Sequence, residues 1–297
     1  MAGTESFSPR YRGLDAWDDA EILEAIWEGQ ARAVAAVRPA LAAIASAARA
    51  IAERIEPDGR LIYVGAGSSG RQAALDGMEL GATFGWPAHR VAFVLAEGLT
   101  LDPAVKATDE DDGEEALRQI GALAPRGTDA LIAVAASGAT PFTLTAAKAA
   151  RSAGALVVAI ANNAEAPLFR HATHPVLLQS GAEAIAGSTR LNAGTAQKAA
   201  LGMLSTLLMT RLGHIHDGLM VSMRPDCAKL ERRAARIVAD IAGCADDAAW
   251  QALEACGGRI KPAVLVARGA APEEAGRLLS EAGGNLRIAL GRLSCSD

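Results

Sequence analysis

Two segments of the chain join a buried strand directly to a loop of glycine and hydroxyl residues, a pattern suited to binding an anion. The first runs from Leu61–Val64 into Gly65-Ala66-Gly67-Ser68-Ser69-Gly70-Arg71. The second is an apolar strand, Ala130–Ala135, followed by Ala136-Ser137-Gly138-Ala139-Thr140-Pro141. Free N–H groups at a helix start, next to serine hydroxyls, bind negative charge. A bare turn is the commoner explanation of any one such loop, but the second copy favours a functional role.

A third loop of the same kind, Gly187-Ser188-Thr189-Arg190, precedes a long helical pattern over Thr195–Leu212, with Gln197 and Lys198 in its first turn. Three hydroxyl-rich loops at helix starts predict one phosphorylated ligand held from several sides. The loops are neither a P-loop, whose lysine and spacing are missing, nor a dinucleotide fingerprint, whose third glycine is absent. The candidate binding residues are Gly67, Ser68, Ser69, Gly70, Arg71, Ser137, Gly138, Thr140, Ser188, Thr189, Arg190 and Lys198.

Glu79 lies in the helical stretch Gln72–Leu80 that the first loop is expected to open. Eight to ten helical residues carry a side chain about 12–15 Å along the axis, roughly the length of an extended hexose phosphate. A ligand whose phosphate binds the loop would therefore reach Glu79 with its other end. A solvated surface residue is the commoner reading of a helical glutamate, although Met78 and Leu80 indicate a partly apolar setting.

An acidic run, Asp109-Glu110-Asp111-Asp112, follows the apolar strand Val91–Leu95 after a loop. Such a run is typical of a helix N-terminus, where carboxylates favour the positive end of the helix dipole. Its place beyond a strand end also lets one of the four face a ligand cleft. Two carboxylates with different pKa values can divide the acid and base roles of a reaction.

The order of elements predicts an α/β fold with a doubly wound, parallel, five-stranded sheet flanked by helices. The expected strands are Leu61–Val64, Val91–Leu95, Ala130–Ala135, Leu156–Ile160 and Val176–Leu178. Ligands of such sheets bind beyond the strand C-termini, where the hydroxyl loops would gather. An N-terminal arm and two helices broken near Pro39 would occupy residues 1–55, the sheet domain 56–222, and a small helical subdomain 223–297. The helices expected in that subdomain are Asp226–Ala242, Asp246–Ala255, Pro272–Ala282 and Asn285–Leu293.

Composition excludes several classes of function for this chain of 297 residues. Its net charge of −5 argues against a nucleic-acid partner. No early stretch resembles a signal peptide, and no run of about eighteen apolar residues predicts a membrane span. The four cysteines lack C-x-x-C spacing, which predicts reduced thiols in the cytoplasm. The histidines lack i,i+4 metal spacing, so no metal is expected.

Taken together, these segments resemble the N-acetylmuramic acid 6-phosphate etherases of the sugar isomerase (SIS) domain superfamily. The resemblance covers nearly the whole chain, beginning at Thr4-Glu5. Its most specific block is Ala193-Gly194-Thr195-Ala196-Gln197-Lys198 followed by Met203-Leu204-Ser205-Thr206. Its other motifs are the three loops above and Leu75-Asp76-Gly77-Met78-Glu79. The family's two catalytic glutamates carry over to Glu79 and Glu110, with Asp109 as the alternative if the loop alignment slips by one.

The resemblance implies cleavage of the lactyl ether of N-acetylmuramate 6-phosphate to N-acetylglucosamine 6-phosphate and D-lactate, without metal or organic cofactor. In the ring-opened sugar the C2 proton is α to an aldehyde, so a carboxylate can remove it, and the protonated C3 lactyl oxygen then departs. A non-catalytic sugar-phosphate-binding regulator of the same fold is an alternative. An aminosugar-phosphate isomerase, which would use the same proton abstraction without a leaving group, is another.

The chain departs from the family pattern at four places. Ala139 replaces the arginine of Ser-Gly-Arg-Thr-Pro, and Asn192 replaces the lysine of Met-Lys-Ala-Gly-Thr. Asp226-Cys227 replaces the Thr-Asn of the family's Thr-Asn-x-Lys-Leu. Lys106 places a positive charge where the family usually has none. Lost cations weaken the binding of an anionic substrate, and they favour the regulator. Arg71, Arg190 and Lys198 remain to compensate.

The long helix Thr195–Leu212 carries apolar residues on more than one face. One face of a sheet covers only one of them, which predicts a homodimer with sites shared between subunits. The alternative is that the N-terminal helices, Asp19–Ile55, cover the helix within one chain.

Overall fold

A computed structural model describes residues 3–99 and 107–294 of the chain. The chain folds into two compact units: Met1–Met78 with His89–Ser205, and Glu79–Ala88 with Thr206–Asp297. Lys106, one of the departures noted in the sequence, lies outside the described residues.

A parallel sheet of five strands forms the centre of the first unit, in the order β2-β1-β3-β4-β5. The strands are β1 (Leu61–Gly65), β2 (Val91–Leu95), β3 (Ala130–Val134), β4 (Leu156–Ala161) and β5 (His174–Leu177). Every residue of β1, β3 and β4 is buried, as expected where helices cover both faces of a sheet. The predicted α/β fold is confirmed. Strand β2 is added on one side of β1, and β3, β4 and β5 are added on the other side, so the strand order switches between β1 and β3. Sheets of this kind bind their ligands at such a switch point.

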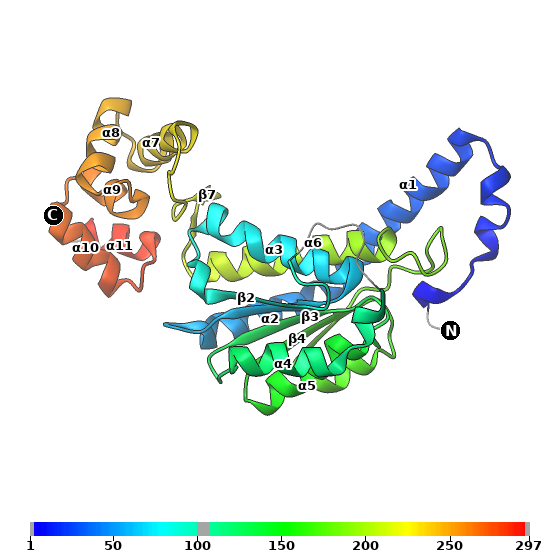
Figure 1. Cartoon of the computed structure of the whole chain (residues 1–297). Helices are drawn as coiled ribbons and strands as arrows, with labels where there is room; N and C mark the ends of the chain where they lie inside the picture. The colour runs from blue at the N-terminus through cyan, green and yellow to red at the C-terminus, as the bar shows by residue number, and fades with distance from the viewer. Residues whose placement is uncertain (1–2, 100–106, 295–297) are drawn as a thin grey trace. The chain divides into compact units, whose positions relative to one another are not determined.

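Helices cover both faces of this sheet (Figure 1). On one face, α4 (Gly113–Leu123) and α5 (Pro141–Ser152) pack against Ile62, Val64 and their neighbours. On the other lie α3 (Gly67–Phe84) and α6 (Asn192–Arg211). The Tyr63 hydroxyl donates to Asp76 Oδ2 of α3 at 2.8 Å, and Ser205 Oγ of α6 donates to Asp76 Oδ1 at 2.9 Å. This buried network ties α3 and α6 to β1.

The N-terminal region contains two α-helices, as the sequence predicts. They are α1 (Asp19–Ala35) and α2 (Leu41–Ile55), with a 3-10 turn at Arg38–Ala40 between them. Asp18 begins α1 by accepting the Glu21 N–H at 3.0 Å. The apolar side of α2 is buried next to β5. Further 3-10 helices are Gly3–Glu5, Pro9–Tyr11, Leu14–Ala16, Ala88–Arg90, Ala107–Asp111 and Pro167–His171.

By length and composition alone, Asp19–Ile55 is apolar enough to cross a membrane, with a mean hydropathy of 1.4 in its most apolar window. The sequence analysis found no such run. Core helices of water-soluble proteins pass the same test. Here the stretch is two helices divided at Pro39, and α2 uses its apolar residues to cover the sheet.

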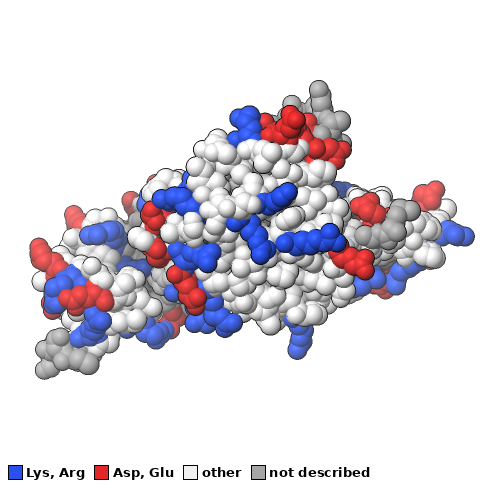
Figure 2. Space-filling view, turned by 90° about the horizontal axis from the view of Figure 1, so that it is seen from below, with Lys and Arg blue, Asp and Glu red and all other residues white. Residues whose placement is uncertain are grey.

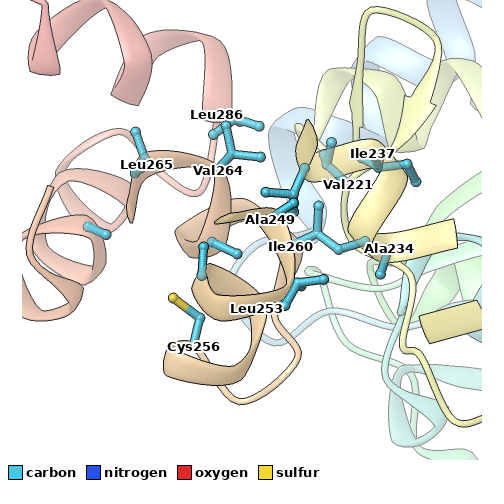
Figure 3. Packing of buried hydrophobic residues seen from close by; sticks show 14 of the residues in the cluster. Val221, Ala234, Ile237, Ala249, Leu253, Cys256, Ile260, Val264, Leu265 and Leu286 are labelled. Atoms are coloured by element: carbon cyan, nitrogen blue, oxygen red, sulfur yellow. The ribbon is translucent and has the colours of Figure 1, made fainter. Parts of the chain in front are cut away.

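Five short helices build most of the second unit around one apolar core (Figure 3). They are α7 (Ala228–Ala242), α8 (Asp246–Ala255), α9 (Ile260–Ala267), α10 (Pro272–Glu281) and α11 (Leu286–Leu293), preceded by a hairpin of β6 (Ile215–His216) and β7 (Leu219–Met220). The sequence pattern did not predict α9. Its short run, Ile-Lys-Pro-Ala-Val-Leu-Val-Ala, is apolar without helical spacing because most of its sides are buried.

Candidate functional site

The first hydroxyl-rich segment forms the N-terminal turn of α3 rather than a loop before it. The helix begins at Gly67, five residues earlier than the sequence predicted. This start requires close backbone approach, because a Cβ on Gly70 would lie 2.8 Å from the carbonyl carbon of Gly65. Glu79 follows Gly67 by twelve positions in the helix, and twelve helical residues rise about 18 Å. Glu79 is therefore farther from this turn than the expected 12–15 Å.

A carboxylate that the sequence analysis missed occupies the start of α3. Glu97 Oε1 accepts the Gly67 N–H at 2.8 Å, and Glu97 Oε2 lies 3.9 Å from Arg71 Nη2. The Glu97 side chain is 9% exposed. A negative charge is stabilised at the positive end of a helix. The Gly67 amide thus already binds an anion supplied by the protein.

Glu110 lies at the same helix start. A Cβ built on Gly67 would be 2.5 Å from Glu110 Oε1 and 3.9 Å from Glu97 Oε1. Partial burial, and then the charges of Glu97 and Asp111, raise the pKa of the Glu110 carboxyl, and Arg71 opposes the shift. The rest of the acidic run serves the helix that follows, since Asp112 caps α4 by accepting the Glu115 N–H at 2.8 Å.

Glu79 lies on α3, as predicted, at the first position of the segment that belongs to the second unit. Its side chain is exposed, and Met78 beside it is 56% exposed, while Leu80 is buried. The structure thus brings Glu110 and Arg71 together at Gly67, and it places Glu79 farther along the helix.

The second hydroxyl-rich loop differs from the first in its charge. Here α5 begins at Pro141, as predicted, its N-cap Thr140 makes no side-chain capping bond, and its first turn has no acidic residue. Ser137 Oγ accepts the Ala139 N–H at 3.1 Å. Gly138 has φ +69°, and a Cβ there would collide with Ala166. This turn is therefore a tight, uncharged cradle at the positive end of a helix.

The third loop does not lead directly into a free helix start. The helix α6 begins at Asn192, and the buried Glu183 carboxylate accepts the N–H groups of Asn192 and Ala193, each at 2.8 Å. Burial raises the pKa of Glu183, against these two hydrogen bonds. Within the loop, Ser188 and Thr189 are half-buried and Arg190 is exposed. Because α6 starts before Thr195, Gln197 and the half-buried Lys198 fall in its second turn.

The N-terminal segment links the second and third loops. Asn163 Nδ2 donates to Thr4 Oγ1 at 3.2 Å and to the Ser137 carbonyl at 3.4 Å. The Gly187 N–H donates to the Thr4 carbonyl at 3.2 Å. Ser137 and the Gly187 turn are thereby held near a common residue that is distant in sequence.

The structure describes the contacts of two residues that depart from the family pattern, Asn192 and Cys227. Asn192 is buried, donates to the Ala182 carbonyl at 3.0 Å, and accepts from Gln30 of α1 at 3.4 Å. This amide packs α1 against α6, a place where a lysine would bury a charge. Cys227 is exposed at the N-cap of α7 and makes no side-chain capping bond.

One face of the molecule is shown with its charges in Figure 2. Lys and Arg side chains stand singly or in small groups on a mostly uncharged surface, with acidic side chains among them. Within the described ranges, no group of three or more His, Cys, Asp and Glu residues is arranged to hold a metal ion.

A parallel sheet with hydroxyl-rich turns at its carboxyl edge is the architecture of the SIS domain, and residues 28–162 match the family model described by that name. A solved protein from Bacteroides fragilis, named as a candidate phosphosugar isomerase, superimposes with a TM-score of 0.53 at 20% identity, covering 68% of this chain and 95% of that one. This likeness supports the fold.

The relatives define the family more narrowly. Three proteins named N-acetylmuramic acid 6-phosphate etherase align over 97% of this chain, at 45% identity (Deinococcus radiodurans), 42% (Rubrobacter xylanophilus) and 41% (Streptomyces coelicolor). The alignments cover 95%, 95% and 93% of those proteins. The chain belongs to the N-acetylmuramic acid 6-phosphate etherase family.

Proposed function

We propose that this protein cleaves the lactyl ether of N-acetylmuramate 6-phosphate, releasing D-lactate and N-acetylglucosamine 6-phosphate. The observation that carries the proposal is full-length similarity to etherases together with the Glu110 carboxyl at the start of α3. Burial and the neighbouring carboxylates raise the pKa of Glu110 above its usual value, a shift in the direction that suits a proton-transferring group.

The reaction needs two proton transfers on the ring-opened sugar. One carboxylate removes the C2 proton, which is acidic because it is α to the aldehyde. A carboxylic acid protonates the C3 lactyl oxygen, so lactate leaves and an unsaturated aldehyde remains. Water then adds at C3. Glu79 and Glu110 are the proposed pair, and Asp109 remains the alternative to Glu110.

The phosphate group is best accommodated at the β3–α5 turn. A doubly charged phosphate at the α3 start would meet the carboxylates of Glu97 and Glu110, whose like charge repels it. At the α5 start, Ser137, Gly138 and Thr140 offer hydroxyl and backbone groups, and the first turn of α5 contains no acidic residue. Ser188 and Thr189 complete the cradle in this proposal, with Arg190 and Lys198 supplying positive charge.

The position of Glu79 supports a site shared between two subunits. The rise of about 18 Å along α3 from Gly67 to Glu79 exceeds the length of about 12–15 Å expected for an extended hexose phosphate, which favours Glu79 and Glu110 from different subunits. In a twofold dimer the second subunit can supply Glu79 to the first. Exposed apolar side chains on α1 and α6, including Leu23, Trp27 and Met203, are 66%, 64% and 43% exposed and offer surface for such contact.

The activity is tested by incubating purified protein with N-acetylmuramate 6-phosphate and measuring D-lactate, with unphosphorylated N-acetylmuramate as the control substrate. Lactate should appear with the phosphorylated sugar and depend on Glu79. Tight binding without lactate release would contradict the etherase. It would instead identify a sugar-phosphate-binding regulator, which the missing cation at Ala139 favours.

Sharing of the site is tested by mixing two inactive variants, Glu79→Gln and Glu110→Gln, after brief dissociation. If the two carboxylates come from different subunits, half of the dimers are hybrids, each with one intact site. About a quarter of wild-type activity should then return. Mixtures that stay inactive while light scattering shows dimers would place both carboxylates in one subunit.

We place the protein in the cytoplasm. The free thiols of Cys227, Cys244 and Cys256 suit a reducing compartment. Its substrate, a sugar phosphate, suits the same location.

A further inference from the structure

The second unit contains a cleft of about 570 Å³, a size within the usual range for small-molecule sites. All of its lining comes from that unit. The loop after β7, the turn before α9, the first residues of α9 and the end of α10 build it.

The charges in this lining are all positive. Arg224, Arg259 and Lys261 contribute them, and within the part of the chain that the structure describes no aspartate or glutamate lines the cleft. Among residues 3–99 and 107–294, none of the three forms an ion pair with a carboxylate. Arg259 Nε donates to the Cys256 carbonyl at 3.1 Å, and Lys261 Nζ donates to the Gly284 carbonyl at 2.7 Å. Some arginines of this unit do have a counter-charge, such as Arg277 with Glu281 at 3.0 Å.

Lys261 shows most clearly that a positive charge of the cleft is not balanced by a nearby carboxylate among the described residues. Its side chain is partly buried, and this burial lowers the pKa of its ammonium group to about 8. A carboxylate nearby would oppose that shift. Arg224 and Arg259 are the other charged groups of the lining, and the α10 and Gly284 segments contribute only apolar and carbonyl groups. An anion bound here would stabilise the charged form of Lys261.

Apart from Ser222, the other side chains of the lining are apolar. Val221 and Ile260 belong to the core of the unit, where they lie among its buried side chains (Figure 3). Met223 is buried, and Leu279 packs against the same core. A ligand that fills the cleft would therefore combine an anionic head with an apolar body.

We propose that this cleft is a second binding site, separate from the sugar-phosphate site, for a small amphipathic organic anion. The head is a carboxylate or a similar acidic group held by Arg224, Arg259 and Lys261. The body is a short aliphatic or aromatic group seated on Val221 and Ile260. The inference does not depend on the etherase reaction.

The probe is 8-anilinonaphthalene-1-sulfonate, an aromatic anion that fluoresces when it leaves water, titrated into the full chain, with octanoate as competitor. Saturable binding of one probe per chain, displaced by octanoate but not by neutral octanol, is expected. Failure to saturate, or equal displacement by octanol, would show a nonspecific apolar surface and overturn the proposal.

Substitutions locate the probe. Arg224→Gln changes an exposed residue and leaves the core untouched, and Lys261→Met removes the partly buried charge. Each should weaken binding by about tenfold, the usual scale for one charged hydrogen bond. The control is Arg268→Gln, which removes the same charge from the far end of α9, outside the lining. Circular dichroism and thermal melting confirm that each variant is folded. Equal weakening in the control, or unchanged affinity in Arg224→Gln, would overturn the proposal.

The pH dependence gives a second readout. Because the ammonium of Lys261 is lost as pH rises through about 8, affinity should fall by up to about tenfold between pH 7 and pH 9. This fall should disappear in Lys261→Met and persist in Arg268→Gln. Displacement of the probe by N-acetylmuramate 6-phosphate would instead show that the cleft is part of the substrate site, and would refute the proposal of a separate binding site.

Discussion

The β1–α3 and β3–α5 junctions begin from the same sequence pattern, a buried strand running into serine and glycine, and end with opposite electrostatics. At α3 the first amide is bound by Glu97, and Glu110 lies beside it. At α5 no acidic residue stands in the first turn, and Thr140 leaves the helix uncapped. One junction thus suits proton transfer, and the other suits an anionic ligand.

The difference lies in residues outside either motif. Glu97 is thirty positions from the amide that it accepts, and Glu183 fills the start of α6 in the same way. A helix N-terminus binds a ligand anion only when no carboxylate of the protein has already taken its amides. Of the three predicted anion sites, two therefore carry their own anion.

The sharpest test of the α3 junction is Glu110→Gln. Removing the acid or base should lower kcat by about 10²–10⁴-fold while KM stays within about twofold, because the amide keeps the shape of the side chain. Steady-state D-lactate release measures both constants. Glu114→Gln, an exposed substitution in the first turn of α4, is the control. A kcat within twofold of wild type would remove Glu110 from the mechanism.

Glu97→Gln separates charge from geometry at the same junction. The glutamine oxygen still accepts the Gly67 N–H, but the negative charge that helps raise the pKa of Glu110 is gone. The pKa of Glu110 should fall, so the limb of the pH–rate profile that belongs to Glu110 should move to lower pH. The loss of kcat at the optimum should be about tenfold at most. An unmoved limb, as expected for Glu114→Gln, would show that Glu97 does not tune Glu110.

Ser137→Ala tests the α5 junction. Loss of one neutral hydrogen bond to the phosphate should raise KM by about two- to tenfold and leave kcat nearly unchanged. Ser152→Ala, exposed at the last residue of α5, is the matched control. If Ser137→Ala lowers kcat with an unchanged KM, the phosphate does not bind at this turn.

Ala139→Arg should give the smallest effect, and in the opposite direction. Ala139 is exposed beside the α5 start, where the family carries an arginine. A new cation near the phosphate should lower KM by about two- to fivefold, and added salt should shrink the gain. Ala139→Gln supplies length without charge. Equal effects of the two variants would argue against a phosphate at this place.

Much of the fold could be predicted from the sequence because its strands are continuous apolar runs. The strand Val91–Leu95 and the helix start at Pro141 agree with the structure residue for residue. The start of α3 could not be predicted in this way, since glycine and serine favour loops. The close approach of Gly65, the last residue of β1, and Gly70, in the first turn of α3, is a contact between two elements that spacing along the chain does not reveal.

The candidate site was predictable in part. Glu110 was named as a site residue, and the structure places it near Gly67. Glu97 was missed, although one signal was present: an acidic residue stands two positions after β2, at the sheet edge where ligands bind. Its partner amide lies on another element, and spacing along the chain does not reveal such a pair.

The bonds around Thr4 have a practical consequence for anyone who produces the protein. This residue meets Asn163 and the Gly187 turn through three hydrogen bonds, and Asn163 in turn reaches the Ser137 carbonyl. A tag fused shortly before Thr4 would lie next to that contact, whereas a tag fused after α11 would be attached to the other unit. Kinetic constants from the two tagged forms are therefore not interchangeable until they have been compared with those of untagged protein.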